Sequence, residues 1–168
     1  IPLIFFKIIK FIKNVDHILN LQGDEPNINK DDIINLSNFM INNNFEIGTL
    51  AAAIKNNEML SNKNVVKVIT KNSLVKNDSS LAINFTRDNL SIDYKNIYHH
   101  IGIYFYKVSA LEKLVNLPQT KNEIENRLEQ LRALDNKMKI NVVLAKSSPI
   151  GVDTEEDYLA IKKIMEYK

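Results

Sequence analysis

Strand patterns alternate with helix patterns along most of this 168-residue chain. Runs of β-branched and aromatic residues predict strands, whereas apolar residues at helical spacing predict amphipathic helices. We expect strands at 18–21, 45–54, 65–70, 81–87, 98–106 and 139–145, and helices at 30–44, 56–60, 109–116, 120–136 and 154–167. The chain is 45% hydrophobic and shows no repeat or linker, which is typical of a single domain, 1–168. The alternation predicts an α/β fold, with a mixed, mostly parallel sheet flanked by helices.

The first twelve residues are markedly apolar. They are too short to span a bilayer, and two lysines interrupt them. A secretory signal would carry its charges before the apolar stretch, so this segment does not fit one. We predict an amphipathic helix whose apolar face holds Leu3, Ile4, Ile8 and Phe11. Because the chain opens with Ile1 rather than Met, we expect that residues upstream of it have been lost.

Composition excludes several classes of site. The net charge is +2 and the lysines are scattered, so no basic stripe indicates nucleic-acid binding. The chain has no cysteine, which rules out disulfides, thiolate zinc sites and a cysteine nucleophile. This composition is compatible with a reducing cytoplasm, where we expect the protein to lie without inserting into a membrane.

An acidic turn follows the first predicted strand. Gly23 and Pro26 end the apolar run at 18–21 and leave Asp24 in the turn. Open α/β sheets bind ligands at the carboxyl ends of their strands, which makes Asp24 a candidate functional carboxylate. Alternatively, Asp24 ends the strand and hydrogen-bonds its own backbone, as aspartate often does in turns.

A second carboxylate, Asp153, occupies a similar place between the last predicted strand and the last helix. Taken alone, it is a helix cap, a position that aspartate favours. Taken with Asp24, it forms a pair of hard oxygen ligands at strand ends, which suits Mg²⁺. Phosphoryl and nucleotidyl transfer need such a cation, because negative charge builds on the transferring phosphate and on the leaving group.

Four segments, in order along the chain, resemble the CMP-Kdo synthetases, the 3-deoxy-manno-octulosonate cytidylyltransferases of lipopolysaccharide synthesis. They are LNLQGDEP, HHIGIYFY, ENRLEQLRAL and PIGVDTEEDY. The resemblance implies a nucleotide-diphospho-sugar transferase-like fold in a homodimer. It also implies the transfer of CMP from CTP to the sugar acid Kdo, with Mg²⁺, release of pyrophosphate and no covalent intermediate.

The resemblance also assigns the candidate site residues. Asp24 and Asp153 match the metal-binding aspartates of the family. The positions that line its sugar-acid pocket are matched by Gln22, Arg87, His100, Tyr104, Glu129 and Gln130. Arg87 could pair with the Kdo carboxylate through a fork of donors, and the polar groups could order sugar hydroxyls.

These assignments have structural alternatives. His99 and His100 could be ordinary strand residues on opposite faces. Glu129 and Arg132 have the i, i+3 spacing of a solvated helical pair. Tyr104 could instead belong to the core, as could Tyr106.

The sequence also departs from the family pattern. The family opens with a loop that holds the CTP phosphates, followed by a second nucleotide-binding segment, and neither is present here. Its S-R-x-x-I-P motif is replaced by residues 86–91, TRDNLS, without the proline. The chain therefore resembles the carboxyl-terminal two-thirds of such an enzyme, missing its first strands. Three hypotheses follow: part of an active enzyme, a truncated non-catalytic remnant, or a related cytidylyltransferase of the sialic-acid type.

Overall fold

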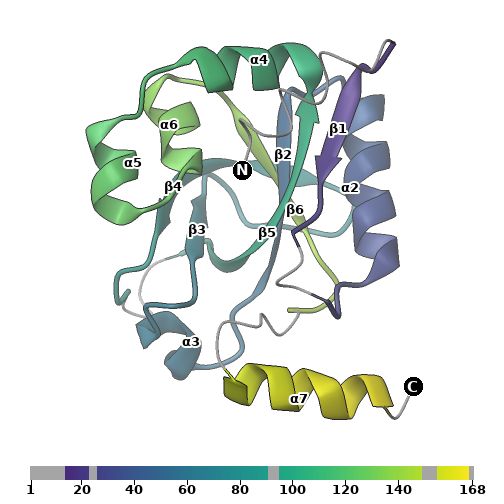
Figure 1. Cartoon of the computed structure of the whole chain (residues 1–168), viewed down its shortest axis with the longest axis vertical. Helices are drawn as coiled ribbons and strands as arrows, with labels where there is room; N and C mark the ends of the chain where they lie inside the picture. Colours follow the sequence, from purple (N-terminus) through teal and green to yellow (C-terminus); the bar gives the residue numbers. More distant parts are fainter. Residues whose placement is uncertain (1–13, 23–25, 91–94, 149–154, 167–168) are drawn as a thin grey trace.

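A computed structural model of the chain describes residues 14–22, 26–90, 95–148 and 155–166 (Figure 1). Its strands are β1 (His17–Asn20), β2 (Ile47–Ala53), β3 (Lys67–Thr70), β4 (Ser79–Thr86), β5 (Ile97–Lys107) and β6 (Ile140–Leu144). Its helices are α2 (Lys30–Asn42), α3 (Asn57–Ser61), α4 (Val108–Asn116), α5 (Lys121–Asn126), α6 (Gln130–Asp135) and α7 (Glu155–Glu166). The predicted helix at the start of the chain lies outside the described residues. Among the helices that are described, none is long and apolar enough to cross a membrane.

The strands form one six-stranded sheet in the order β1-β5-β2-β6-β4-β3, with a further pairing of β3 to β5. This confirms the predicted mixed sheet. The expectation that it is mostly parallel is wrong for the described strands, because β2 with β6 is the parallel pair and the other pairings are antiparallel. The reason is that β5 runs against three neighbours, while β3 and β4 form a hairpin-like pair.

Strand β5 is the centre of this arrangement. Its carboxyl-terminal half pairs with β1, most of its length pairs with β2, and its first residues pair with β3. The pairing of β2 with β5 shifts register between Thr49 and Leu50, and the other neighbour of β5 is β1 on one side of this irregularity and β3 on the other. Strands β1 and β2 are both antiparallel to β5, and β6 is parallel to β2. Therefore β1, β2 and β6 run in the same direction and end toward the same edge of the sheet.

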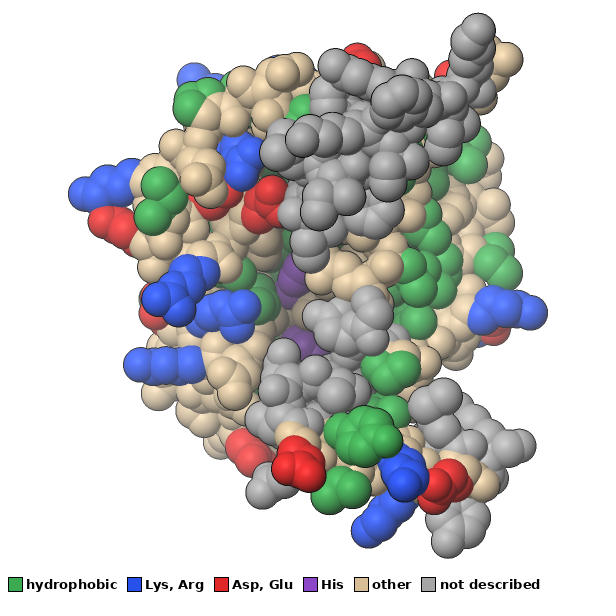
Figure 2. Space-filling view, viewed as in Figure 1, with side chains coloured by type: hydrophobic (Ala, Val, Ile, Leu, Met, Phe, Trp, Pro, Cys, Tyr) green, Lys and Arg blue, Asp and Glu red, His purple; other side chains and the backbone are tan. Residues whose placement is uncertain are grey.

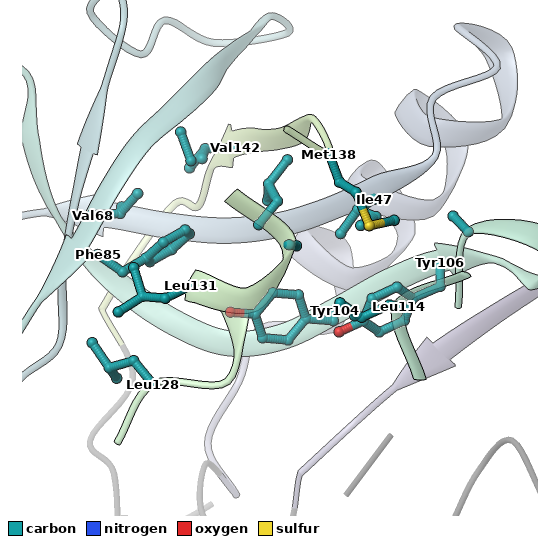
Figure 3. Packing of buried hydrophobic residues seen from close by; sticks show 14 of the residues in the cluster. Ile47, Val68, Phe85, Tyr104, Tyr106, Leu114, Leu128, Leu131, Met138 and Val142 are labelled. Atoms are coloured by element: carbon teal, nitrogen blue, oxygen red, sulfur yellow. The ribbon is translucent and has the colours of Figure 1, made fainter. Parts of the chain in front are cut away.

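Apolar side chains cover both faces of the sheet. On one face, Leu36 and Met40 of α2 pack in a cluster with Leu50, Ile101 and Phe105. Helix α2 comes so close to β2 that a Cβ atom at Gly48 would meet the Met40 side chain. On the other face, α4 and α6 pack on a larger cluster, which contains Tyr104 and Tyr106 (Figure 3). The candidate site residues of β5 therefore border a packed core.

The predicted helix at 120–136 is two helices in the structure. The capping box of Thr120 and Glu123 is confirmed and begins α5. Arg127 then adopts the left-handed conformation, with φ of 53°, and ends α5. Helix α6 begins anew at Gln130. The second predicted capping box, of Thr154 with Asp157, rests on side chains outside the described set.

Candidate functional site

Several candidate residues meet on the α4–α6 face of the sheet. Tyr104 in β5 is paired with Asn20 of β1 on one side and with Thr49 of β2 on the other. The rings of His100 and Tyr104 are 5.5 Å apart, and Phe85 of β4 stacks edge-on against His100 at 5.0 Å. Histidine side chains are visible near the middle of the molecule in Figure 2. The β-sheet register therefore gathers residues that are far apart in the sequence.

His100 is a buried, neutral hydrogen-bonding group. Its pKa is lowered to about 3, chiefly by burial and also by the charges of His99 and Arg87. Its Nε2 lies 3.0 Å from the Thr49 hydroxyl oxygen. That hydroxyl has one proton, which it donates to a backbone carbonyl, Ile103 O being 2.8 Å away. We therefore assign the Nε2-protonated tautomer, which leaves Nδ1 as an acceptor.

Tyr104 has a buried hydroxyl that lacks a hydrogen-bond partner within the described residues, and so does the amide oxygen of Asn20. Burial raises the pKa of Tyr104 well above its ordinary value, and Tyr106 and Glu129 add to this. The hydroxyl therefore remains a neutral donor at pH 7. Because a buried polar group without a partner is costly, these two atoms are candidates for hydrogen bonds to a polar ligand or to water. Tyr104 packs in the core and is also a candidate ligand group.

The junction between α5 and α6 supplies Glu129. Its carboxylate is half-buried, and burial raises its pKa. Arg132 lies 3.5 Å from it, yet the principal partner of Arg132 is Glu123, which accepts from the guanidinium Nε at 2.8 Å. The i, i+3 pair of Glu129 with Arg132 is therefore present, with a part-exposed Glu129 and a nearly buried Arg132, and it is secondary to the pair of Arg132 with Glu123. Gln130 is the first residue of α6 and is half-buried.

Arg87 follows β4 directly and is half-buried. Its Nη1 donates to the backbone carbonyls of Asn64 at 3.1 Å and Lys63 at 3.3 Å. Its charge contributes to lowering the pKa of His100. Gln22 lies two residues past the end of β1 and is half-buried.

The predicted metal ligands, Asp24 and Asp153, lie outside the described residues. Within the ranges that are described, no group of three His, Asp or Glu side chains could hold a metal ion. The strands that precede the two aspartates, β1 and β6, do run in the same direction. The segment after β6 is held by α2, because the buried Asp32 carboxylate accepts from the Lys146 backbone N–H at 3.1 Å.

Sequence reasoning missed three residues of this region. Asn20 carries an unpartnered buried oxygen, Thr49 holds His100, and Lys67 is a fully buried lysine beside the end of β4. Asn20 lies two residues before Gln22, and residues two apart on a strand lie on the same face. This spacing could have indicated Asn20 as a further candidate. Thr49 and Lys67 become informative once the strand register is known.

A family model described as cytidylyltransferase matches residues 4–140. This chain belongs to the cytidylyltransferase family. Its curated relatives include proteins named 3-deoxy-manno-octulosonate cytidylyltransferase. The one from Bartonella bacilliformis is 38% identical over 88% of this chain and 60% of its own length. The one from Thermodesulfovibrio yellowstonii is 42% identical over 88% of this chain and 60% of its own length. The predicted resemblance to the CMP-Kdo synthetases is thus confirmed.

Solved structures agree with this assignment. A CMP:2-keto-3-deoxy-manno-octonic acid synthetase in complex with CTP superposes with a TM-score of 0.84 at 26% identity, covering 99% of this chain and 68% of that one. A UDP-glucose pyrophosphorylase, at 12% identity, has a TM-score of 0.69 over 99% of this chain and 60% of that one, and shows the same fold. The chain spans about 60% of the length of the curated relatives that it matches.

Proposed function

We propose that the protein to which this chain belongs transfers CMP from CTP to Kdo, giving CMP-Kdo and pyrophosphate. The observation that carries this proposal is the identity of 38–42% with proteins named for this activity, over 88% of the chain. In the proposed reaction, the anomeric hydroxyl of Kdo attacks the α-phosphorus of CTP. The bond between the α-phosphorus and the bridging oxygen breaks, and pyrophosphate leaves with that oxygen.

The face around β5 suits a sugar acid. Arg87 offers a guanidinium fork for the carboxylate, as proposed from the resemblance. The neutral His100 offers an acceptor nitrogen and Tyr104 a donor hydroxyl, which are partners for sugar hydroxyls. Gln22, Glu129 and Gln130 supply further polar groups. These roles are proposals, supported by the proximity of His100 to Tyr104 and by the electrostatic influence of Arg87 and Glu129 on them.

We also propose that Asp24 and Asp153 hold Mg²⁺. Two observations support this: both residues are carboxylates, the hard oxygen ligands that this ion prefers, and both follow strands that end at one edge of the sheet. The ion would neutralise charge on the phosphates of CTP. We further infer a cytoplasmic protein that acts as a homodimer, in which residues 1–168 belong to a single domain.

Pyrophosphate release from CTP and Kdo, by the protein to which this chain belongs, tests the proposal. Release that depends on both substrates and on Mg²⁺ is the expected result. Release with sialic acid in place of Kdo would identify the related enzyme instead. If no release occurs with either sugar acid, the chain belongs to a non-catalytic remnant. The reading frame upstream of Ile1 gives an independent check, because an in-frame phosphate-binding loop supports the enzyme and a stop codon supports the remnant.

A further inference from the structure

Lys67, the first residue of β3, is a fully buried lysine. Its exposed fraction is 0%, and it is among the largest side chains with no access to solvent. Lysine is almost never fully buried unless it is paired with a carboxylate. Within the described residues, no carboxylate lies within ion-pair distance of Lys67. Burial lowers the pKa of Lys67, and the more distant charge of Asp88 opposes this only in part. A hydrophobic side chain of similar length would avoid the desolvation cost of this ammonium. We therefore expect a function that requires a lysine at this position.

Two backbone carbonyls hold the ammonium. Lys67 Nζ donates to Asn62 O at 3.0 Å, just after α3, and to Arg87 O at 3.1 Å, just after β4. The Arg87 guanidinium also binds the turn after α3, because its Nη1 donates to Asn64 O at 3.1 Å. The turn is itself fixed, because the Asn64 N–H donates to Asn62 Oδ1 at 2.8 Å. Lys67 and Arg87 therefore belong to one network that joins the end of β4 to the Asn62–Asn64 turn.

The strand register places Lys67 on the face of the sheet away from His100. Lys67 is directly paired with Thr86 on β4 and with His99 on β5. Neighbouring residues of a strand alternate in face, so Lys67 and His99 share one face, and Phe85 and His100 share the other. Arg87 directly follows β4, and its charge lowers the pKa of both His100 and Lys67. Lys67 can thus act on the candidate site through the backbone carbonyl of Arg87.

We propose that Lys67 is a positioning residue for Arg87. By holding the Arg87 carbonyl, the buried ammonium fixes the main chain where β4 ends, and so positions the guanidinium to receive the carboxylate of the sugar acid. The inference rests on the proposed function for the identity of that ligand. The positioning itself is a property of the protein without ligand, which allows the two to be tested separately.

The test compares Lys67→Met, Arg87→Ala and the double variant in the protein to which this chain belongs. Lys71→Met is the matched control, because Lys71 is an exposed lysine that directly follows β3. Calorimetry measures the Kd for Kdo. NMR relaxation measures the order parameter of the Arg87 Nε–H bond in the absence of ligand. Thermal unfolding of each variant reports on the fold.

We expect Lys67→Met to weaken Kdo binding by roughly tenfold, since it loosens a charge-assisted contact. In the Arg87→Ala background, the same change should have less than about a twofold further effect, because residues that act through one another are not additive. The Arg87 order parameter should fall in Lys67→Met, and Lys71→Met should match the unchanged protein in every measurement.

A lower melting temperature with unchanged Kd and unchanged Arg87 order parameter would overturn the inference and leave Lys67 as a purely structural residue. Additive effects of the two changes on Kd would overturn it as well. If the unchanged protein does not bind Kdo, the proposed function fails, while the order parameter still decides whether Lys67 positions Arg87. Should Lys67→Met not fold, Lys67→Gln retains a neutral donor, and the same measurements apply to it.

Discussion

His100 and Tyr104 lie near each other on β5, and burial shifts their pKa values in opposite directions. Burial lowers the pKa of the imidazole to about 3 and raises that of the phenol, so both groups are neutral at pH 7. Neutral groups in a buried site recognise hydroxyls by hydrogen bonds and do not compete for the ligand charge. Recognition of the ligand charge is the role that we propose for Arg87.

The first prediction concerns stability against pH. The pKa of His100 in the folded state lies below its unfolded value of about 6.5. The contribution of His100 to the free energy of unfolding is therefore fully present above pH 6.5 and is lost as the pH falls. We expect the free energy of unfolding to fall between pH 6.5 and 5, by up to about 1.4 kcal/mol per pH unit for this group. Urea unfolding of the chain and of His100→Gln measures this. An equal slope in both proteins would show that His100 is accessible to protons in the folded state.

A second prediction concerns the proposed metal ligands. In the active protein, Asp24→Asn or Asp153→Asn should lower kcat by several orders of magnitude while the fold remains intact. The amide retains the shape of the side chain but removes the charge that holds Mg²⁺. Steady-state kinetics and circular dichroism provide the measurements. If Asp153→Asn instead lost stability and kept its activity, the helix-cap alternative for that residue would be correct.

At the scale of elements, the junction of α5 and α6 determines where Glu129 lies. The left-handed Arg127 ends α5, and the Leu128 N–H donates to the Glu123 carbonyl at 3.2 Å, which turns the chain toward α6. The buried ion pair of Glu123 with Arg132 then joins the two helices, with further hydrogen bonds from Gln119 and Thr120 to the Glu123 carboxylate. A candidate ligand residue is thus placed by a local break and a buried pair.

This arrangement predicts a strong effect at Glu123. Glu123→Ala should destabilise the chain by about 3–5 kcal/mol, because it leaves the buried guanidinium of Arg132 without its main partner. Glu125→Ala is the control on the same helix, since the exposed Glu125–Lys121 pair should contribute less than about 1 kcal/mol. Chemical denaturation measures both. Similar losses for the two variants would mean that the pair with Arg132 does not hold the junction.

At the scale of the whole molecule, five of the described strands pair in a closed ring and β1 lies at an edge. Strands β2, β3, β4, β5 and β6 form a continuous circuit of pairings, whereas β1 pairs with β5 alone among the described strands. An edge strand offers unpaired backbone groups to another strand. The candidate site lies next to this edge, through Asn20 and Tyr104.

We predict that the 168-residue chain by itself does not make CMP-Kdo at a useful rate. Positioning and charge stabilisation account for most catalysis in phosphoryl transfer, and the family's phosphate-binding loop is absent from this sequence. Pyrophosphate release by the purified chain, measured next to a full-length relative, tests this. A comparable rate for the two would contradict the prediction.

The same edge predicts association. We expect the isolated chain to form dimers or larger species and to be poorly soluble, because β1 can pair with another chain. Size-exclusion chromatography with light scattering measures the mass at micromolar concentration. A stable, monodisperse monomer would show that the outer edge of β1 is protected.

The sequence by itself determined the alternation of strands and helices, the Thr120 capping box, and the segments that carry the family resemblance. Those features are local, since periodicity and capping depend on residues a few positions apart. Only the tertiary structure decided the direction of the strands, the break at Arg127, the pairing of Arg132 with Glu123, and the burial of Lys67. Strand direction and burial depend on partners distant in sequence. No local sequence pattern indicates which backbone carbonyls will accept hydrogen bonds from a buried ammonium.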